Sequence, residues 1–85
     1  FRRVLFRSRT IISVDDDPVM GQVIYWGEQA IDISQVSVAV ARNPNWKVLL
    51  RYHQDIPYSV LDEVHQQILM GGQSKVVFAA FKSGG

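Results

Sequence analysis

Hydrophobic and polar side chains alternate from Trp46 to Tyr52, which is the pattern of a β-strand. Leu49 places an apolar side chain on the second face, so we expect both faces of this strand to be at least partly covered. Pro57 follows after a short interruption of the pattern. Proline disfavours helical backbone at the residue before it but suits the first turn of a helix, so a helix is predicted to begin there.

The segment from Pro57 to Met70 has the apolar period of an amphipathic helix. Gly71 and Gly72 supply the residue type with which such helices commonly end. The predicted core face of the helix consists of Pro57, Leu61, Val64 and Ile68.

The run from Lys75 to Phe81 is short and apolar, and it predicts a strand buried on both faces. The connection from the strand that contains Val48 is long enough for a crossover helix, so the two strands can be parallel. We therefore predict a right-handed β-α-β unit over residues 46–81.

Two shorter β-prone runs, Thr10–Val14 and Gln22–Trp26, lie upstream and predict an antiparallel hairpin with a long loop. The turn-forming residues of this loop begin at Asp15–Asp17 and Pro18. The three aspartates lack the alternating ligands, the central glycine and the terminal glutamate of an EF-hand loop. We interpret them as a solvated turn and not as a calcium site.

The segment 33–42 is ambiguous, because valines at alternate positions would also fit a strand. We predict a helix with Asp32 as its N-cap, since a helix would cover the sheet and leave only Val38 exposed. The expected order is strand, strand, helix, strand, helix, strand. This order predicts an α+β domain of two layers, with two helices packed on one face of a mixed β-sheet.

The octet Phe1–Ser8 resembles the in-frame translation of a sequencing-library adapter, and we expect it to be foreign to the protein. A basic strand start beside a membrane is the alternative. The octet holds three of the nine basic side chains, which leaves six basic against eight acidic ones and a net charge of −2 in residues 9–85. We assign residues 9–82 to one domain and residues 83–85 to a disordered tail.

The composition of the 85 residues excludes several classes of function. No cysteine is present, so disulfide and thiol chemistry are excluded. No run approaches the roughly 20 apolar residues that cross a bilayer. The absence of a basic patch with interleaved aromatic residues argues against nucleic-acid binding. Because the chain opens at Phe1 without a methionine, we expect it to be a fragment.

Neither the histidines nor the serines form a recognisable catalytic or metal-binding motif. His53 is expected at the surface of a turn and His65 at the edge of the helix, with no spacing that would bind zinc. Ser59 and Ser74 lack a glycine elbow and an evident histidine and acid. We therefore predict no enzyme activity, no cofactor and no metal, and a binding or scaffold role is the default.

Two segments, residues 48–59 and 70–76, resemble the C-terminal half of the ExbD/TolR family. In that family a strand runs into an aspartate-containing turn and a Val/Ile-Pro-Tyr-Gly helix start. A later Ala-Gly-Ile-x-Lys-Val motif ends the helix and opens the last strand. Residues 12–36, which include Gly21, are similar to the family's hairpin and first helix, so that the match covers residues 9–81.

The chain departs from the family pattern at two positions. His53 stands where the family usually has aspartate, which removes a negative charge from the turn. Ser59 stands where it usually has glycine, a mild change because serine is well tolerated in the first turn of a helix.

The resemblance implies the periplasmic domain of a subunit driven by the proton motive force in the bacterial inner membrane. Family members carry a single transmembrane helix with a proton-binding aspartate, and this anchor would be missing from the present fragment. They act with an ExbB- or TolQ-type channel protein and pass energy to a TonB- or TolA-type protein. Binding of peptidoglycan, as in TolR-like members, is the alternative function.

We expect the domain to form a homodimer and to bind its partner near the turn that follows the strand. The candidate partner-binding residues are Tyr52, His53, Asp55 and Tyr58. The alternative is that this turn only joins the strand to the helix.

Overall fold

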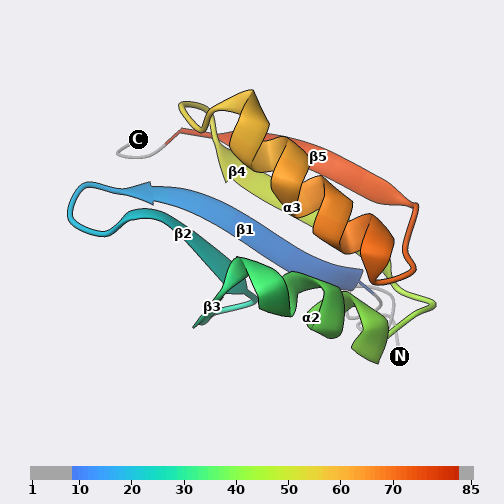
Figure 1. The fold of residues 1–85 in the computed structure, drawn as a ribbon. Coiled ribbons are helices and arrows are strands. Elements are labelled where there is room, and N and C mark those ends of the chain that lie inside the picture. The colour runs from blue at the N-terminus through green and yellow to red at the C-terminus, as the bar shows by residue number, and fades with distance from the viewer. Residues whose placement is uncertain (1–8, 83–85) are drawn as a thin grey trace, which may run out of the picture.

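The computed structural model describes residues 9–82, so the predictions for Phe1–Ser8 and for the tail 83–85 fall outside the described residues. Residues 9–82 form five strands, two α-helices and one 3₁₀ turn (Figure 1). In order, these elements are β1 (Arg9–Asp17), β2 (Gly21–Trp26), β3 (Gln29–Ile31), η1 (Ile33–Gln35), α2 (Val36–Arg42), β4 (Lys47–His53), α3 (Tyr58–Met70) and β5 (Val76–Phe81).

The five strands form one mixed sheet in the order β3-β2-β1-β4-β5. β2 is antiparallel to both β1 and β3, whereas β4 is parallel to both β1 and β5. The predicted α+β class and mixed sheet are therefore confirmed. The predicted parallel pairing of β4 and β5, the strands before and after α3 in the chain, is confirmed as well. Strand β3 was missed by the sequence analysis, because its three residues are too short to show an alternating pattern.

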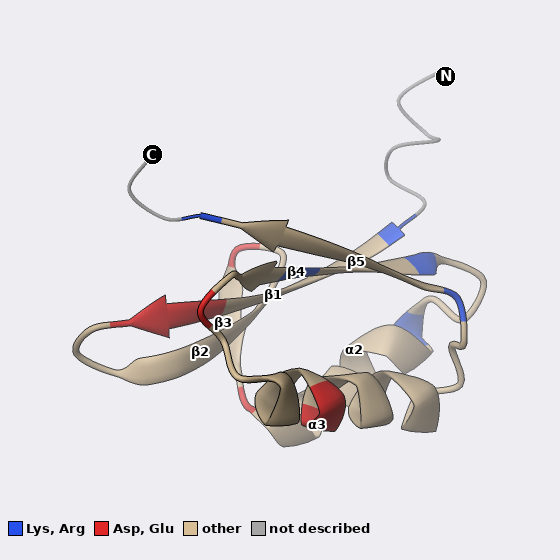
Figure 2. Cartoon of the chain, turned by 90° about the horizontal axis from the view of Figure 1, so that it is seen from above, with Lys and Arg blue, Asp and Glu red and all other residues tan. Residues whose placement is uncertain are grey.

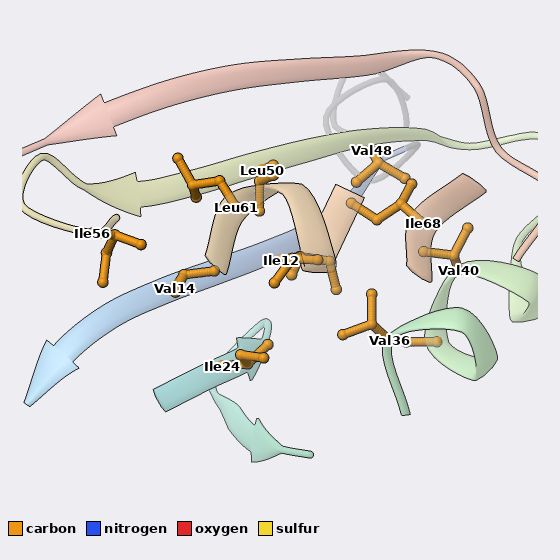
Figure 3. Close-up of a cluster of buried hydrophobic side chains, with 12 residues drawn as sticks. Ile12, Val14, Ile24, Val36, Val40, Val48, Leu50, Ile56, Leu61 and Ile68 are labelled. Carbon is orange, nitrogen blue, oxygen red and sulfur yellow. The ribbon is translucent and has the colours of Figure 1, made fainter. Parts of the chain in front are cut away.

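The hydrophobic core lies between the sheet and the helices, which Figure 2 shows on the same side of the sheet. Alternate residues of the central strands β1 and β4 point into it, as the period of two requires. On α3, three of the four predicted core residues are buried, whereas Pro57 is exposed because it precedes the helix as its N-cap. The largest fully buried side chains, most of which are labelled in Figure 3, are Ile12, Leu50, Ile68, Val14, Val36, Val40, Val48 and Val64.

The hairpin of β1 and β2 is tighter than the sequence analysis predicted. Asp15, Asp16 and Asp17 pair with Val23, Gln22 and Gly21, so the aspartates continue β1 instead of forming a solvated turn. Only residues 18–20 remain as the loop, which corrects the predicted long loop. Backbone pairing along the hairpin overrides the turn preference of aspartate, because these side chains lie at the end of the sheet, where they reach solvent.

Strand β5 is an edge strand, which corrects the prediction that it is buried on both faces. Val77 is 55% exposed and Phe78 is 44% exposed. An apolar run alone cannot distinguish a central strand from the last strand of a parallel unit, because both consist of hydrophobic residues.

The helical layer begins at Asp32, as predicted. The Asp32 carboxylate accepts hydrogen bonds from the backbone N–H of Ser34 at 3.2 Å and from its hydroxyl at 2.6 Å. The Gln35 side chain accepts one from the backbone N–H of Asp32 at 2.9 Å, which completes a capping box. The helical prediction for residues 33–42 is confirmed, with a first turn of 3₁₀ type, and Val38 is 59% exposed.

Candidate functional site

The candidate partner-binding turn joins the end of β4 to the start of α3. The backbone N–H of Ile56 donates to the carbonyl of His53 at 3.0 Å and thereby closes the turn. Ile56 is buried and fixes the turn to the core, whereas Pro57 adopts extended backbone and directs the chain into α3. The turn is thus held by the backbone hydrogen bond between Ile56 and His53 and by the burial of the Ile56 side chain in the core.

His53 is buried, with only 6% of its surface exposed, so the expectation of a surface histidine is wrong. Its Nδ1 accepts a hydrogen bond from the backbone N–H of Asp55 at 3.1 Å and lies 3.7 Å from the Asp55 carboxylate. His53 is the last residue of β4, whereas the sequence predicts it in the turn. Its burial makes it a structural part of the site and not a contact surface.

The other three candidate residues differ in exposure. Tyr58 is 80% exposed at the first residue of α3, and the Asp55 side chain is 68% exposed. Tyr52 is half-buried on the helix-facing side of β4. The structure therefore gathers all four residues at one end of the sheet, but only Asp55 and Tyr58 present side chains freely to solvent.

The turn is continuous with the edge strand β5. The ring of Tyr52 contacts Phe78 edge to face at a centroid distance of 6.4 Å, and His53 contacts Phe81 in the same way at 5.7 Å. The backbone N–H of Gln54 donates to the carbonyl of Phe81 at 2.9 Å. The turn and β5 thus form one surface, which we call the turn–edge surface and define as residues 52–58 together with β5.

The sequence analysis missed the aromatic residues of β5 as part of this surface. Phe78 also contacts His65 of α3 edge to face, at a centroid distance of 5.2 Å. The available signal was the aromatic content of a strand at the end of the β-α-β unit, where an edge position is common. This signal is ambiguous, because an apolar run with aromatic residues is also typical of a strand buried in the core.

Two carboxyl groups outside the turn have perturbed acidity. Hydrogen bonds from the backbone N–H groups of Met20 and Val19 lower the pKa of Asp17. Hydrogen bonds from the Ser34 hydroxyl and backbone N–H lower the pKa of Asp32. Both carboxylates hold local backbone in place, so these shifts report turn and cap structure and not catalysis.

A hollow of about 530 Å³ lies away from the turn, between β2, β3, η1 and α3. Its floor is aliphatic and includes Ile24 and Val60, and its rim carries Asp32 and Glu63.

Residues 9–82 contain no group of three or more acidic, histidine or cysteine side chains that could hold a metal ion. Of the helices in the same range, none is both long and apolar enough to span a membrane.

These features define a small α+β domain with a long apolar sheet edge beside a supported turn. No protein-family model matches the chain, and no curated protein matches it as a relative.

Proposed function

We propose that this chain is the periplasmic domain of an energy-transducing transport subunit of ExbD/TolR type in the bacterial inner membrane. It acts with an ExbB- or TolQ-type channel protein and passes energy to a TonB- or TolA-type protein. The observation that carries the proposal is the turn–edge surface, because the segments that resemble this family build its turn and lead into its edge strand.

The residues that carry the resemblance occupy positions where the fold has special requirements. Pro57 caps α3, Gly71 ends it against α2, and Gly72 has a φ of +96°, a backbone conformation that favours glycine. A Cβ atom on Gly71 would come within 2.7 Å of the Ser37 carbonyl oxygen, so only glycine allows the two helices to approach this closely. The requirements at Pro57 and Gly72 support the resemblance, because they explain a proline and a glycine at the positions where the family pattern has them. Gly71 stands where the family motif has alanine, so its close approach to α2 is a feature of this chain.

Strand β5 suits recognition by strand addition. It has no charged residue among its six, and no described strand pairs with its outer side. The opposite edge strand, β3, has only three residues. An extended segment of a partner protein that adds to β5 would gain backbone hydrogen bonds and contacts with Val77 and Phe78.

Strand addition also suits a domain that must release its partner in each energy-transducing cycle. Membrane-buried ionisable residues are costly and mark proton paths, so the proton-carrying aspartate belongs in the membrane helix of such a subunit. The soluble domain needs only a surface that exchanges partners. We further propose that the domain forms a homodimer.

A substitution on β5 tests the proposal. Ala80 is exposed beside Tyr52, and Ala80→Lys places a charged side chain on the turn–edge surface. Lysine on an edge strand opposes strand addition. We expect Ala80→Lys to weaken binding of a periplasmic TonB- or TolA-type segment from the same source at least tenfold in a calorimetric titration. The matched control is Ala41→Lys on the exposed side of α2, which should leave binding unchanged.

Equal effects of the two lysine substitutions would contradict the role of β5, and no binding by the unsubstituted chain would contradict the motor function. Sedimentation with purified sacculi distinguishes the alternative. Retention on sacculi without partner binding would favour a peptidoglycan-binding module of TolR type.

A further inference from the structure

The three parallel strands begin at the same end of the sheet with the same short pattern. In each case a basic residue, at the first position of the strand or just before it, is followed by a buried or half-buried residue and then an aliphatic one. The three triplets are Arg9-Thr10-Ile11 on β1, Lys47-Val48-Leu49 on β4 and Lys75-Val76-Val77 at the start of β5.

The strand register brings these triplets side by side. Arg9 pairs with Lys47, and Ile11 pairs with Leu49. Leu49 in turn pairs with Val77. The backbone N–H of Val48 donates to the carbonyl of Lys75 at 3.1 Å, which extends the parallel register by one residue to Lys47 and Lys75. A row of three cations therefore lies next to a row of three aliphatic side chains.

Both rows lie on the face of the sheet opposite the helices. Thr10 and Val48 are buried toward the core, so the alternating residues before and after them point the other way. Figure 2 shows no described helix on that side of the sheet. We call this surface the basic corner, and it consists of Arg9, Ile11, Lys47, Leu49, Lys75 and Val77.

The charges of the basic corner have no acidic counterpart among the described residues. Among residues 9–82, no lysine or arginine nitrogen lies within 4.0 Å of a carboxylate oxygen, and the contact of a histidine with a carboxylate within that distance is between His53 and Asp55. Carboxylates instead gather at the other end of β1, at Asp15–Asp17 (Figure 2). Like charges directly opposite one another destabilise a sheet, so an anion bound here would relieve a repulsion built into the fold.

The basic corner is also hollowed. Arg9, Lys47, Leu49 and Val77 line a depression of about 220 Å³, together with Val48. Basic side chains line one part of this depression, and aliphatic side chains line the other part. A ligand that fits it has an anionic group beside an apolar part.

We infer that the basic corner binds the surface of a membrane that contains anionic phospholipids. The cations contact the lipid phosphates, and the aliphatic row contacts the boundary between headgroups and acyl chains. The inference rests on the proposed function in one respect, which is that a membrane lies close to the start of β1. It assigns a second surface, which shares Val77 with the turn–edge surface and orients the domain on the bilayer.

Two other occupants fit the basic corner less well. A second copy of the chain that met this surface with its own basic corner would bring two rows of like charge together, which opposes association. Single-stranded nucleic acid would stack its bases on aromatic side chains, but the corner offers only aliphatic ones.

Vesicle sedimentation of the full chain tests the inference. We expect binding to phosphatidylcholine vesicles that contain 30% phosphatidylglycerol and none to pure phosphatidylcholine vesicles. Because each basic residue near such a surface contributes about fivefold, Lys47→Gln combined with Lys75→Gln should lower the partition coefficient about 25-fold. The matched control is Arg51→Gln combined with Lys82→Gln, which also removes two positive charges but near the other ends of β4 and β5. This control should lower the partition coefficient less than threefold.

A test variant and a matched control test the contribution of the aliphatic row to vesicle binding. Val77 and Val38 are 55% and 59% exposed, respectively. We expect Val77→Ser to weaken vesicle binding about fivefold, as loss of a half-buried valine contact predicts, and Val38→Ser to have no effect. All variants keep Arg2, Arg3 and Arg7, so residues 1–8 contribute equally to each measurement.

Equal losses in the two charge pairs would overturn the inference, because binding would then follow net charge alone. Displacement of the bound chain by millimolar soluble glycerophosphoglycerol would also overturn it, since the corner would then recognise a free headgroup and not a membrane. No partner protein enters this assay. Its failure is therefore distinguishable from failure of the proposed function, which is tested by partner titration.

Discussion

At the scale of single residues, Asp32 determines where the helical layer begins. Its carboxylate accepts two hydrogen bonds from Ser34, and these bonds lower its pKa below the ordinary value of 3.8. The unfolded chain therefore binds a proton at Asp32 at a higher pH than the folded chain does. The stabilisation is fully present above the unfolded pKa and is lost as the pH falls through the lowered, folded pKa.

This linkage gives a testable prediction. We expect the free energy of unfolding of the unsubstituted chain to fall when the pH is lowered from 6 to 3, and to fall less in Asp32→Asn. Asparagine keeps an oxygen that caps the helix but does not titrate, so the two proteins should be similarly stable at pH 6. Urea unfolding followed by tryptophan fluorescence measures both values. The same loss on acidification in both proteins would contradict this role for Asp32.

Sequence patterns predicted residues whose role is local and missed those whose role depends on distant partners. The Asp32 cap was predictable because its partners lie within three residues. Gln73 was not, since its buried amide donates to the carbonyls of Pro44 and Trp46, which are far away in the chain. His53 was placed at the surface for the same reason, because the burial of its ring depends on Phe81.

At the scale of elements, the approach of α3 to α2 depends on Gly71. A Cβ atom there would lie 2.7 Å from the Ser37 carbonyl oxygen and 3.0 Å from the Val40 Cβ. Gly71→Ala should lower the free energy of unfolding by about 1 to 3 kcal/mol, as overpacking of a core typically does. Met70→Ala, next to it but 72% exposed, is the control and should have little effect. Equal stability of Gly71→Ala and the unsubstituted chain would show that the helices can separate without cost.

Helices and central strands were predictable from their periods, whereas strand ends and edges were not. Leu61, Val64 and Ile68 are buried on α3 as their spacing predicted. The Asp15–Asp17 segment was predicted as a turn, because aspartate has a poor strand propensity that the register with β2 overrides. The edge position of β5 follows from where the chain adds its last strand, which no local pattern records.

At the scale of the whole molecule, the fold separates two surfaces. The basic corner lies where the parallel strands begin, and the candidate turn lies where β4 ends, near the end of β5. A domain held to a membrane at the first surface would present the second away from it. The α+β class was predictable from the order of elements, but the placement of these surfaces required the strand register, which brings residues far apart in sequence together.

The proposed motor function is tested most directly by the coding sequence upstream of Arg9 in the source DNA, read past the segment that encodes Phe1–Ser8. We predict an apolar segment of roughly 20 residues that contains one aspartate, because such a segment would anchor the domain and carry the proton. A start codon close to Arg9, with no such segment, would contradict the account and leave a binding module without a motor.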